Sequence, residues 1–126
     1  MRAVDTNVLV RILARDDPKQ VRVADEFVSV GAWVSLLALA ETMWVLTTVY
    51  DRHAAEIVAS VEQLLNHKDL ILQDREVAAG ALETFRSRPA LGFTDCLLLE
   101  VARKAGHLPL GTFDRNLSKI DGAEKL

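Results

Sequence analysis

Four acidic residues lie beside predicted strand ends or helix starts, where their carboxylates could meet in one site. They are Asp5 in AVDTNVLV, Glu41 in LLALAETMWVL, Asp95 in GFTDCLLLEVARKAG and Asp114 in GTFDRN. Carboxylate oxygens without an accompanying cluster of His or Cys suit Mg²⁺ or Mn²⁺ rather than a structural zinc. The pattern therefore predicts a divalent-metal site if the four side chains converge.

Two of these acids also have a simpler interpretation as capping residues. Asp5 can be the N-cap of the helix that follows it, because an aspartate accepts a hydrogen bond from a free amide of the first turn. Asp114 can form an Asx-turn, and Thr112 and Asn116 can bond the same loop as ordinary turn residues. If Asp5 is instead a metal ligand, we expect one of the next two residues to cap the helix.

Glu41 is harder to explain as an ordinary surface residue. It shares a predicted helical face with three apolar residues, Leu37, Trp44 and Val45. Burying an unpaired carboxylate costs several kcal/mol, so Glu41 must meet a cation, take up a proton or reach solvent. The alternative is an exposed glutamate on a wide amphipathic helix.

Asp95 begins the apolar face of another predicted helix. Three apolar residues follow it at i+3, i+4 and i+7, namely Leu98, Leu99 and Ala102. Thr94 can be the N-cap of this helix, and an aspartate in the first turn interacts favourably with the helix dipole. A solvent-facing aspartate would serve the dipole equally well, so this position is compatible with both roles.

The remaining residues that often do chemistry are scattered. His53, His67 and His107 are far apart in the sequence, and we expect all three at the surface. Cys96 is the single cysteine and has no histidine placed to activate it, so we expect a helix residue rather than a nucleophile.

Short apolar segments alternate with longer segments of helical periodicity along the chain. Strands are predicted at residues 2–5, 32–35, 70–72 and 108–112, with at most a short edge strand in the last dozen residues. Helices are predicted at residues 7–14, 19–30, 36–50, 52–66, 75–87 and 94–105. This alternation favours an α/β fold, a parallel sheet of four to five short strands with helices on both faces. Ligands bind such sheets at the carboxyl ends of the strands, where all four acids can converge.

Composition is typical of a single globular domain. The chain has 126 residues, of which 50% are hydrophobic and 26% charged. Glu41 interrupts the longest apolar run, so no segment reaches the roughly 20 residues of a membrane span. One cysteine and no secretion signal make the cytoplasm the expected location. A net charge of −3 lacks the basic footprint of many nucleic-acid binders, so any such function must come from a local site.

Four segments, VDTNVLV, SLLALAETMWVL, GFTDCLLLEVA and TFDRNL, give the chain a resemblance to the PIN domain. In particular, it resembles the small ribonuclease toxins of VapC-type toxin–antitoxin pairs. The resemblance implies a single domain over residues 1–126, with a three-layer α/β/α fold. It also implies endonucleolytic cleavage of RNA with Mg²⁺ or Mn²⁺. The implied partners are RNA, a small antitoxin protein and a second copy of the chain.

The resemblance also assigns roles to individual residues. Asp5, Glu41, Asp95 and Asp114 match the acidic positions of the family, and Asn7, Thr112 and Asn116 match positions that often support them. Two divalent cations would neutralise the charge of the four acids, about −4, and a metal-activated water would hydrolyse the phosphodiester bond. Arg11, Arg15 and Arg115 are candidates for contacts to substrate phosphates.

Two other functions are compatible with the same residues. The first is an aspartate-based phosphatase of related topology with Asp5 as nucleophile, which Asn7 disfavours because such enzymes resemble DxD at this point. The second is a catalytically silent binding module whose acids serve only as caps. Trapping a phosphorylated Asp5 would support the phosphatase, and metal titration separates the silent module from the nuclease.

Overall fold

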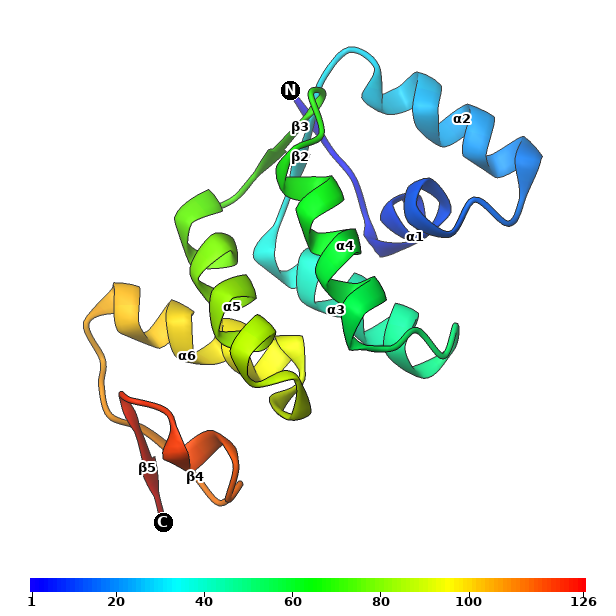
Figure 1. Cartoon of the computed structure of the whole chain (residues 1–126). Coiled ribbons are helices and arrows are strands. Elements are labelled where there is room, and N and C mark those ends of the chain that lie inside the picture. The colour runs from blue at the N-terminus through cyan, green and yellow to red at the C-terminus, as the bar shows by residue number, and fades with distance from the viewer. The chain divides into compact units, whose positions relative to one another are not determined.

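The computed structural model describes residues 1–126 and shows an α/β protein (Figure 1). Six α-helices and two short 3₁₀ helices alternate with five strands, and every paired strand is parallel to its neighbour. The chain divides into two compact units, Met1–Arg75 and Glu76–Leu126. Each unit has its own strands.

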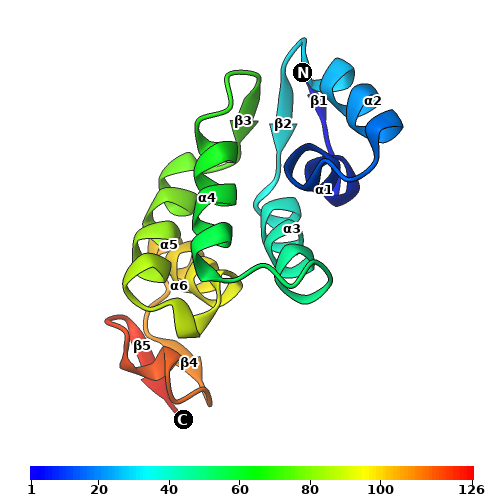
Figure 2. The same ribbon diagram turned by 45° about the vertical axis from the view of Figure 1, so that its right-hand side comes forward.

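The first unit is built on a three-stranded parallel sheet with the order β1-β2-β3. Its elements are β1 (Arg2–Ala3), α1 (Thr6–Ala14), α2 (Pro18–Val28), β2 (Ala32–Val34), α3 (Leu36–Thr48), α4 (Ala54–Leu65) and β3 (Leu70–Leu72). Helix α1 packs against both α2 and α3, while α4 packs against α3 and β3 (Figure 2). The carboxyl ends of β1 and β2 lie at the same edge because Ala3 pairs with Trp33 in register.

Buried and exposed side chains alternate along β2 and β3, and they show which face of the sheet is covered within this unit. Val34 and Leu72 are buried in register, whereas Trp33 and Ile71, which also face each other across β2 and β3, are exposed. Val34 and Leu72 therefore point to the packed face of the sheet within this unit, and Trp33 and Ile71 point to the other face. Three-residue strands with one exposed central residue cannot be distinguished from fully buried strands by their apolar composition alone.

The second unit consists mainly of two helices and a pair of short strands. Its elements are α5 (Arg75–Ser87, whose first residue belongs to the first unit), η1 (Pro89–Leu91), α6 (Phe93–Ala105), β4 (Leu110–Thr112), η2 (Leu117–Lys119) and β5 (Ala123–Lys125). Strands β4 and β5 pair in parallel, with Leu110 opposite Ala123. Phe85 and Phe93 join α5 to α6 through an edge-to-face contact, with ring centroids 6.1 Å apart. The five strands are thus hydrogen-bonded as groups of three and two.

Several predicted boundaries are shifted, for local reasons. The second helix ends at Val28 rather than residue 30, because Ser29 caps it and the chain turns at Gly31, whose φ is +92°. The fourth strand begins at Leu110 rather than residue 108, after Pro109, which has no amide hydrogen to donate. Strand β3 and helix α5 have the predicted bounds.

Candidate metal centre

Asp5 lies just beyond the carboxyl end of β1. The amide of Val4 donates to the carbonyl oxygen of Trp33 at 3.1 Å, which extends the pairing of β1 with β2 up to the residue before Asp5. Asp5 is itself the N-cap of α1, since its Oδ1 accepts a hydrogen bond from the Val8 amide at 3.2 Å. The expectation that Thr6 or Asn7 would be the cap is therefore wrong. The carboxylate remains exposed, and a single capping bond leaves most of its acceptor capacity free.

Glu41 is exposed in the second turn of α3. Leu37 and Trp44 on the same face are also exposed, at 71% and 60%, so the apolar face predicted around Glu41 is not the buried one. The residues that α3 buries are Ala38, Leu39, Thr42, Met43 and Leu46. Within its own unit the Glu41 carboxylate has no hydrogen-bond donor and no basic partner. Of the two environments considered for Glu41 from the sequence, the exposed position is therefore the one observed, and the buried position is not.

The first unit places Asp5 and Glu41 on helices that pack against each other. Asp5 caps α1, Glu41 lies in α3, and both helices follow the same edge of the sheet, after the neighbouring parallel strands β1 and β2. Ser35 begins α3 directly after β2 by accepting a hydrogen bond from the Ala38 amide at 3.0 Å. The two acids thus lie near the carboxyl ends of adjacent strands, where α/β folds bind ligands.

Asp95 lies half-buried in the first turn of α6. The helix begins at Phe93 after Gly92, so Thr94 is inside the first turn and is not the N-cap that the sequence suggests. Burial raises the pKa of the Asp95 carboxyl above its ordinary value, and the negative charge of Asp114 raises it further. No donor of its own unit reaches this carboxylate.

Asp114 lies exposed in the loop between β4 and η2, where its amide and its carboxylate each form a hydrogen bond. Its amide donates to Oγ1 of Thr112 at 3.0 Å, and its Oδ1 accepts from the Leu117 amide at 2.8 Å. The Thr112 hydroxyl is therefore part of the hydrogen bonding of this loop. Asn116 occupies the N-cap position of η2 without a side-chain capping bond.

The four predicted acids are divided equally between the two units. Asp5 and Glu41 belong to the first unit, and Asp95 and Asp114 belong to the second, close enough for their charges to interact. Neither unit alone contains three acidic, His or Cys residues arranged to hold a metal ion.

Comparison with known protein families identifies the family to which this chain belongs. Residues 2–123 match the PIN domain. The chain belongs to the PIN domain family. No curated protein and no solved structure matches it. The match covers all four acids, and it confirms the predicted fold class, an α/β PIN-like fold.

PIN domains are generally metal-dependent nucleases that act on RNA and typically use divalent metals. The acids of this PIN domain fit such a cation. The carboxylates of Glu41 and Asp95 accept no hydrogen bond within their units, those of Asp5 and Asp114 each accept one, and none of the four forms an ion pair. Their oxygens are hard donors that remain available for a cation. No helix of this PIN domain is both long and apolar enough to span a membrane.

Two of the three histidines are exposed, as the sequence predicts, whereas His67 is half-buried. His53 is exposed beside Glu56, His107 is exposed, and Nδ1 of His67 accepts a hydrogen bond from the Asp69 amide at 3.1 Å. Burial, followed by the charges of Asp95 and Glu100, raises the pKa of the Cys96 thiol to about 11. Cys96 is therefore a protonated residue of the core rather than a nucleophile.

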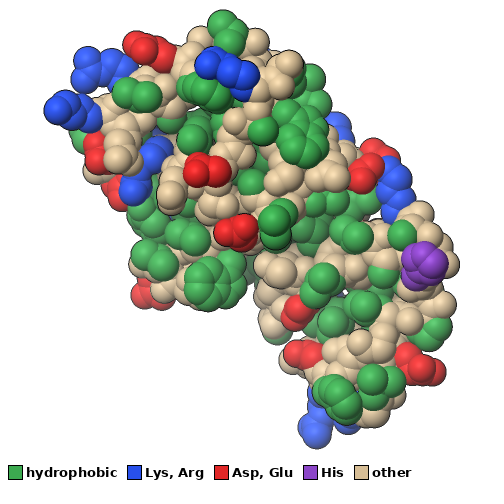
Figure 3. Space-filling view, turned by 180° about the vertical axis from the view of Figure 1, so that it is seen from behind, with side chains coloured by type: hydrophobic (Ala, Val, Ile, Leu, Met, Phe, Trp, Pro, Cys, Tyr) green, Lys and Arg blue, Asp and Glu red, His purple; other side chains and the backbone are tan.

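Two of the three candidate phosphate-binding arginines are engaged elsewhere. Arg11 donates to Asp16 at 2.8 Å and to the Tyr50 hydroxyl at 3.0 Å, and Arg15 donates to Asp25 at 2.9 Å. Only Arg115 has no ion pair among the three. Figure 3 shows exposed hydrophobic side chains between acidic and basic ones on one face of the PIN domain.

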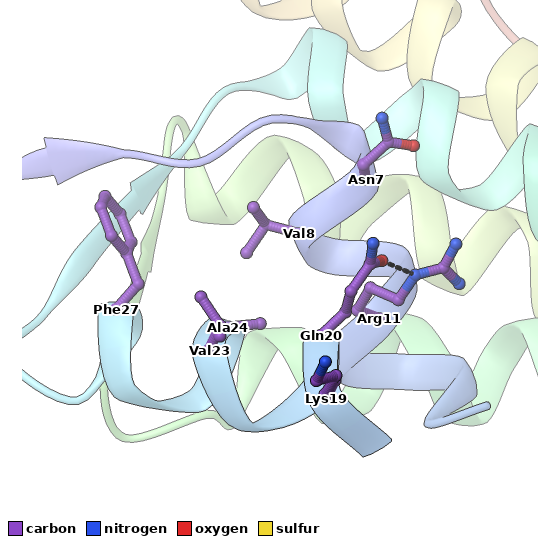
Figure 4. A pocket seen from close by; sticks show the side chains of 8 residues that line it. All are labelled: Asn7, Val8, Arg11, Lys19, Gln20, Val23, Ala24 and Phe27. Atoms are coloured by element: carbon purple, nitrogen blue, oxygen red, sulfur yellow. Dashed lines mark hydrogen bonds between the residues drawn. The ribbon is translucent and has the colours of Figure 1, made fainter. Parts of the chain in front are cut away.

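An apolar cavity of about 460 Å³, which the sequence does not predict, lies between α1 and α2 (Figure 4). Its lining consists of Asn7, Val8, Arg11, Lys19, Gln20, Val23, Ala24 and Phe27. The Arg11 and Gln20 side chains are joined at its rim by a hydrogen bond of 2.6 Å. Because no carboxylate lines it, this cavity is separate from the candidate metal centre, although Asn7 borders it.

Proposed function

We propose that this chain is an endoribonuclease dependent on Mg²⁺ or Mn²⁺ and the toxin of a VapC-type toxin–antitoxin pair. The match of residues 2–123 to the PIN domain is the observation on which the proposal rests. It is supported by the positions of Asp5 and Glu41 beyond adjacent strands and by the proximity of Asp95 to Asp114.

Each acid has a role in the proposed site. Asp5 and Asp95 are the chief metal ligands, while Glu41 and Asp114 hold metal directly or through water. When bound, divalent cations supply polarisation of the scissile phosphate and activation of a water molecule. The Val8 and Leu117 amides orient the carboxylates of Asp5 and Asp114 by donating to them.

The supporting residues act on the loops rather than on the substrate. Thr112 holds the Asp114 amide, and Asn116 follows in the same turn. Asn7 lies exposed in the first turn of α1, two residues after Asp5. No side-chain nucleophile is needed, which agrees with the buried, protonated Cys96 thiol.

The decisive experiment replaces the proposed ligands without changing their size. Asp5→Asn and Asp95→Asn are each expected to reduce RNA cleavage in Mg²⁺ by at least about 100-fold, and EDTA should abolish wild-type cleavage. Glu26→Gln, on exposed α2, is the matched control and should cleave normally. Circular dichroism confirms that each variant is folded. Wild-type rates in both folded ligand variants would refute the nuclease site.

The observed capping bonds favour a second candidate, a catalytically silent PIN-like module. Asp5 and Asp114 each accept a backbone amide, so a purely structural role for them already has direct contacts. Mn²⁺ titration separates the two functions, because a ligand that binds only the native state stabilises it by about 2.7 kcal/mol at 100 times Kd. A nuclease site should raise the melting temperature by roughly 10 °C. A silent module should show no shift.

The toxin assignment adds two protein partners, an antitoxin and a second copy of the chain. Trp44 is 60% exposed on the same face of α3 as the exposed Leu37, two turns away, and aromatic residues frequently anchor interfaces. Copurification of the neighbouring gene's product with the tagged chain would support the antitoxin. Light scattering of the isolated chain tests the homodimer, which Trp44→Glu should weaken if α3 forms the interface.

A further inference from the structure

Phe113 is the one phenylalanine of the chain that the fold leaves in solvent. Phe85 and Phe93 are buried against each other, and Phe27 is half-buried beneath the Arg2 guanidinium, 3.7 Å from its ring centre. The Phe113 side chain is 80% exposed, directly before Asp114. A large exposed ring of this kind is available to pack against another molecule.

The loop that carries Phe113 is held by hydrogen bonds on both sides. Besides the bonds to Thr112 and Leu117 described above, the Ser118 amide donates to the Asp114 carbonyl oxygen at 3.0 Å. Leu117 is only 4% exposed, so the turn after Phe113 is also anchored by an apolar side chain. The ring is therefore presented to solvent by an ordered turn, which reduces the entropy cost of binding.

Arg115 supplies a positive charge on the other side of Asp114. Its side chain is exposed and forms no ion pair, unlike Arg15, which is paired with Asp25, and Arg103, which lies 3.4 Å from Glu100. An aromatic ring, a proposed metal ligand and an unpaired guanidinium thus follow one another in sequence. Consecutive Cα atoms are about 3.8 Å apart, so one nucleotide and its phosphate can reach all three residues.

Resting on the nuclease function proposed above, we propose that Phe113 stacks on an unpaired base of single-stranded RNA while Arg115 contacts a neighbouring phosphate. Proteins bind single strands by stacking bases on aromatic rings and meeting the backbone with cations. A base within a duplex is already stacked and paired, so it offers Phe113 no free face. The pair therefore positions RNA beside Asp114 and selects unpaired segments.

The test measures RNA binding in EDTA, where stacking and phosphate contacts persist without cleavage. The probe is a 12-nucleotide single-stranded RNA with one 2-aminopurine, compared with the same strand in a duplex. Phe113→Leu should weaken single-strand binding on the order of tenfold and reduce 2-aminopurine quenching, while Phe113→Trp should preserve both. Wild type should prefer the single strand.

Arg115 is tested by the salt dependence of the same binding. Arg115→Ala should lower the slope of log affinity against log salt by about one, because one phosphate contact is lost. Arg22→Ala removes an exposed arginine from α2 as the matched control and should leave the slope unchanged. Thermal unfolding verifies that all variants are folded.

The outcomes separate this inference from the nuclease proposal. If the ligand variants lose cleavage but Phe113→Leu binds RNA like wild type, stacking by Phe113 is refuted and the nuclease stands. If Phe113→Leu changes only the oligomeric state, the ring belongs to a protein interface and the inference is again wrong. If wild type fails to bind the single strand in EDTA, the proposed contacts do not exist. If RNA binding depends on Phe113 while the acids prove dispensable for cleavage, only the nuclease site fails.

Discussion

A carboxylate that caps a helix can also bind a metal, because the two functions use different electron pairs. Oδ1 of Asp5 accepts one hydrogen bond from Val8, whereas an ionised carboxylate has about four acceptor positions. The capping bond fixes the direction of the side chain at the end of β1. Asp5 can therefore be both the N-cap of α1 and a metal ligand.

Substitutions at Asp5 should separate these two roles. Asp5→Asn and Asp5→Ser retain a good N-cap, so the free energy of unfolding should change by less than about 0.5 kcal/mol while RNA cleavage is lost. Asp5→Ala also removes the cap and should cost about 1 kcal/mol more. Urea denaturation with parallel cleavage assays measures both effects. Equal destabilisation by all three variants would contradict the capping role.

At the scale of the element, helix α3 has apolar residues on most of its circumference. Its sequence therefore does not show which face of the helix packs against the rest of the protein. Its sequence offers an apolar stripe containing Glu41 and another containing Leu39 and Met43, and only the second is buried. Helical periodicity tells which residues share a face, but a helix without a clear polar side has two plausible inner faces.

A matched pair of leucines tests which face of α3 supports the fold. Leu39 is fully buried and Leu37 is 71% exposed. Leu39→Ala should lower the free energy of unfolding by about 2–5 kcal/mol, because it removes buried methyl groups and leaves a cavity. Leu37→Ala should change it by less than about 0.5 kcal/mol. Similar losses in urea denaturation would show that both leucines are buried.

The turn between α1 and α2 is tied to the end of α3 by Tyr50, whose hydroxyl donates to Asp16 Oδ2 at 2.9 Å. This hydrogen bond is the main reason why the pKa of the Asp16 carboxyl is lowered, with Arg11 adding to the effect. A lowered folded-state pKa stabilises the protein above the ordinary aspartate pKa of about 3.9, and this stability is lost as pH falls through the folded value.

Tyr50→Phe should therefore destabilise the protein more at pH 7 than near pH 2. At neutral pH the variant loses the hydrogen bond to an ionised carboxylate, whereas in acid Asp16 is protonated in both proteins. Urea denaturation of wild type and variant across this range measures the difference. A pH-independent difference would show that the Asp16 charge plays no part.

At the scale of the molecule, the PIN domain match runs through both compact units. We propose that residues 1–126 form one folding domain, as the sequence suggests. Chains of this length usually unfold in a single cooperative step. Calorimetry should then give one transition whose van't Hoff and calorimetric enthalpies agree. Two separable transitions would show that Met1–Arg75 and Glu76–Leu126 are independent domains.

The sequence by itself determined the elements and the candidate residues, because both depend on local pattern. The continuous apolar run of β3 and the periodicity of α5 define their observed bounds, and each predicted acid lies near a strand end or helix start. Tertiary structure decided what depends on contacts between distant residues. Examples are the pairing of the strands into a three-stranded and a two-stranded sheet, the burial of the α3 face that contains Leu39, and the exposure of Phe113. Strand pairing and burial are set by non-local packing, which a local pattern does not encode.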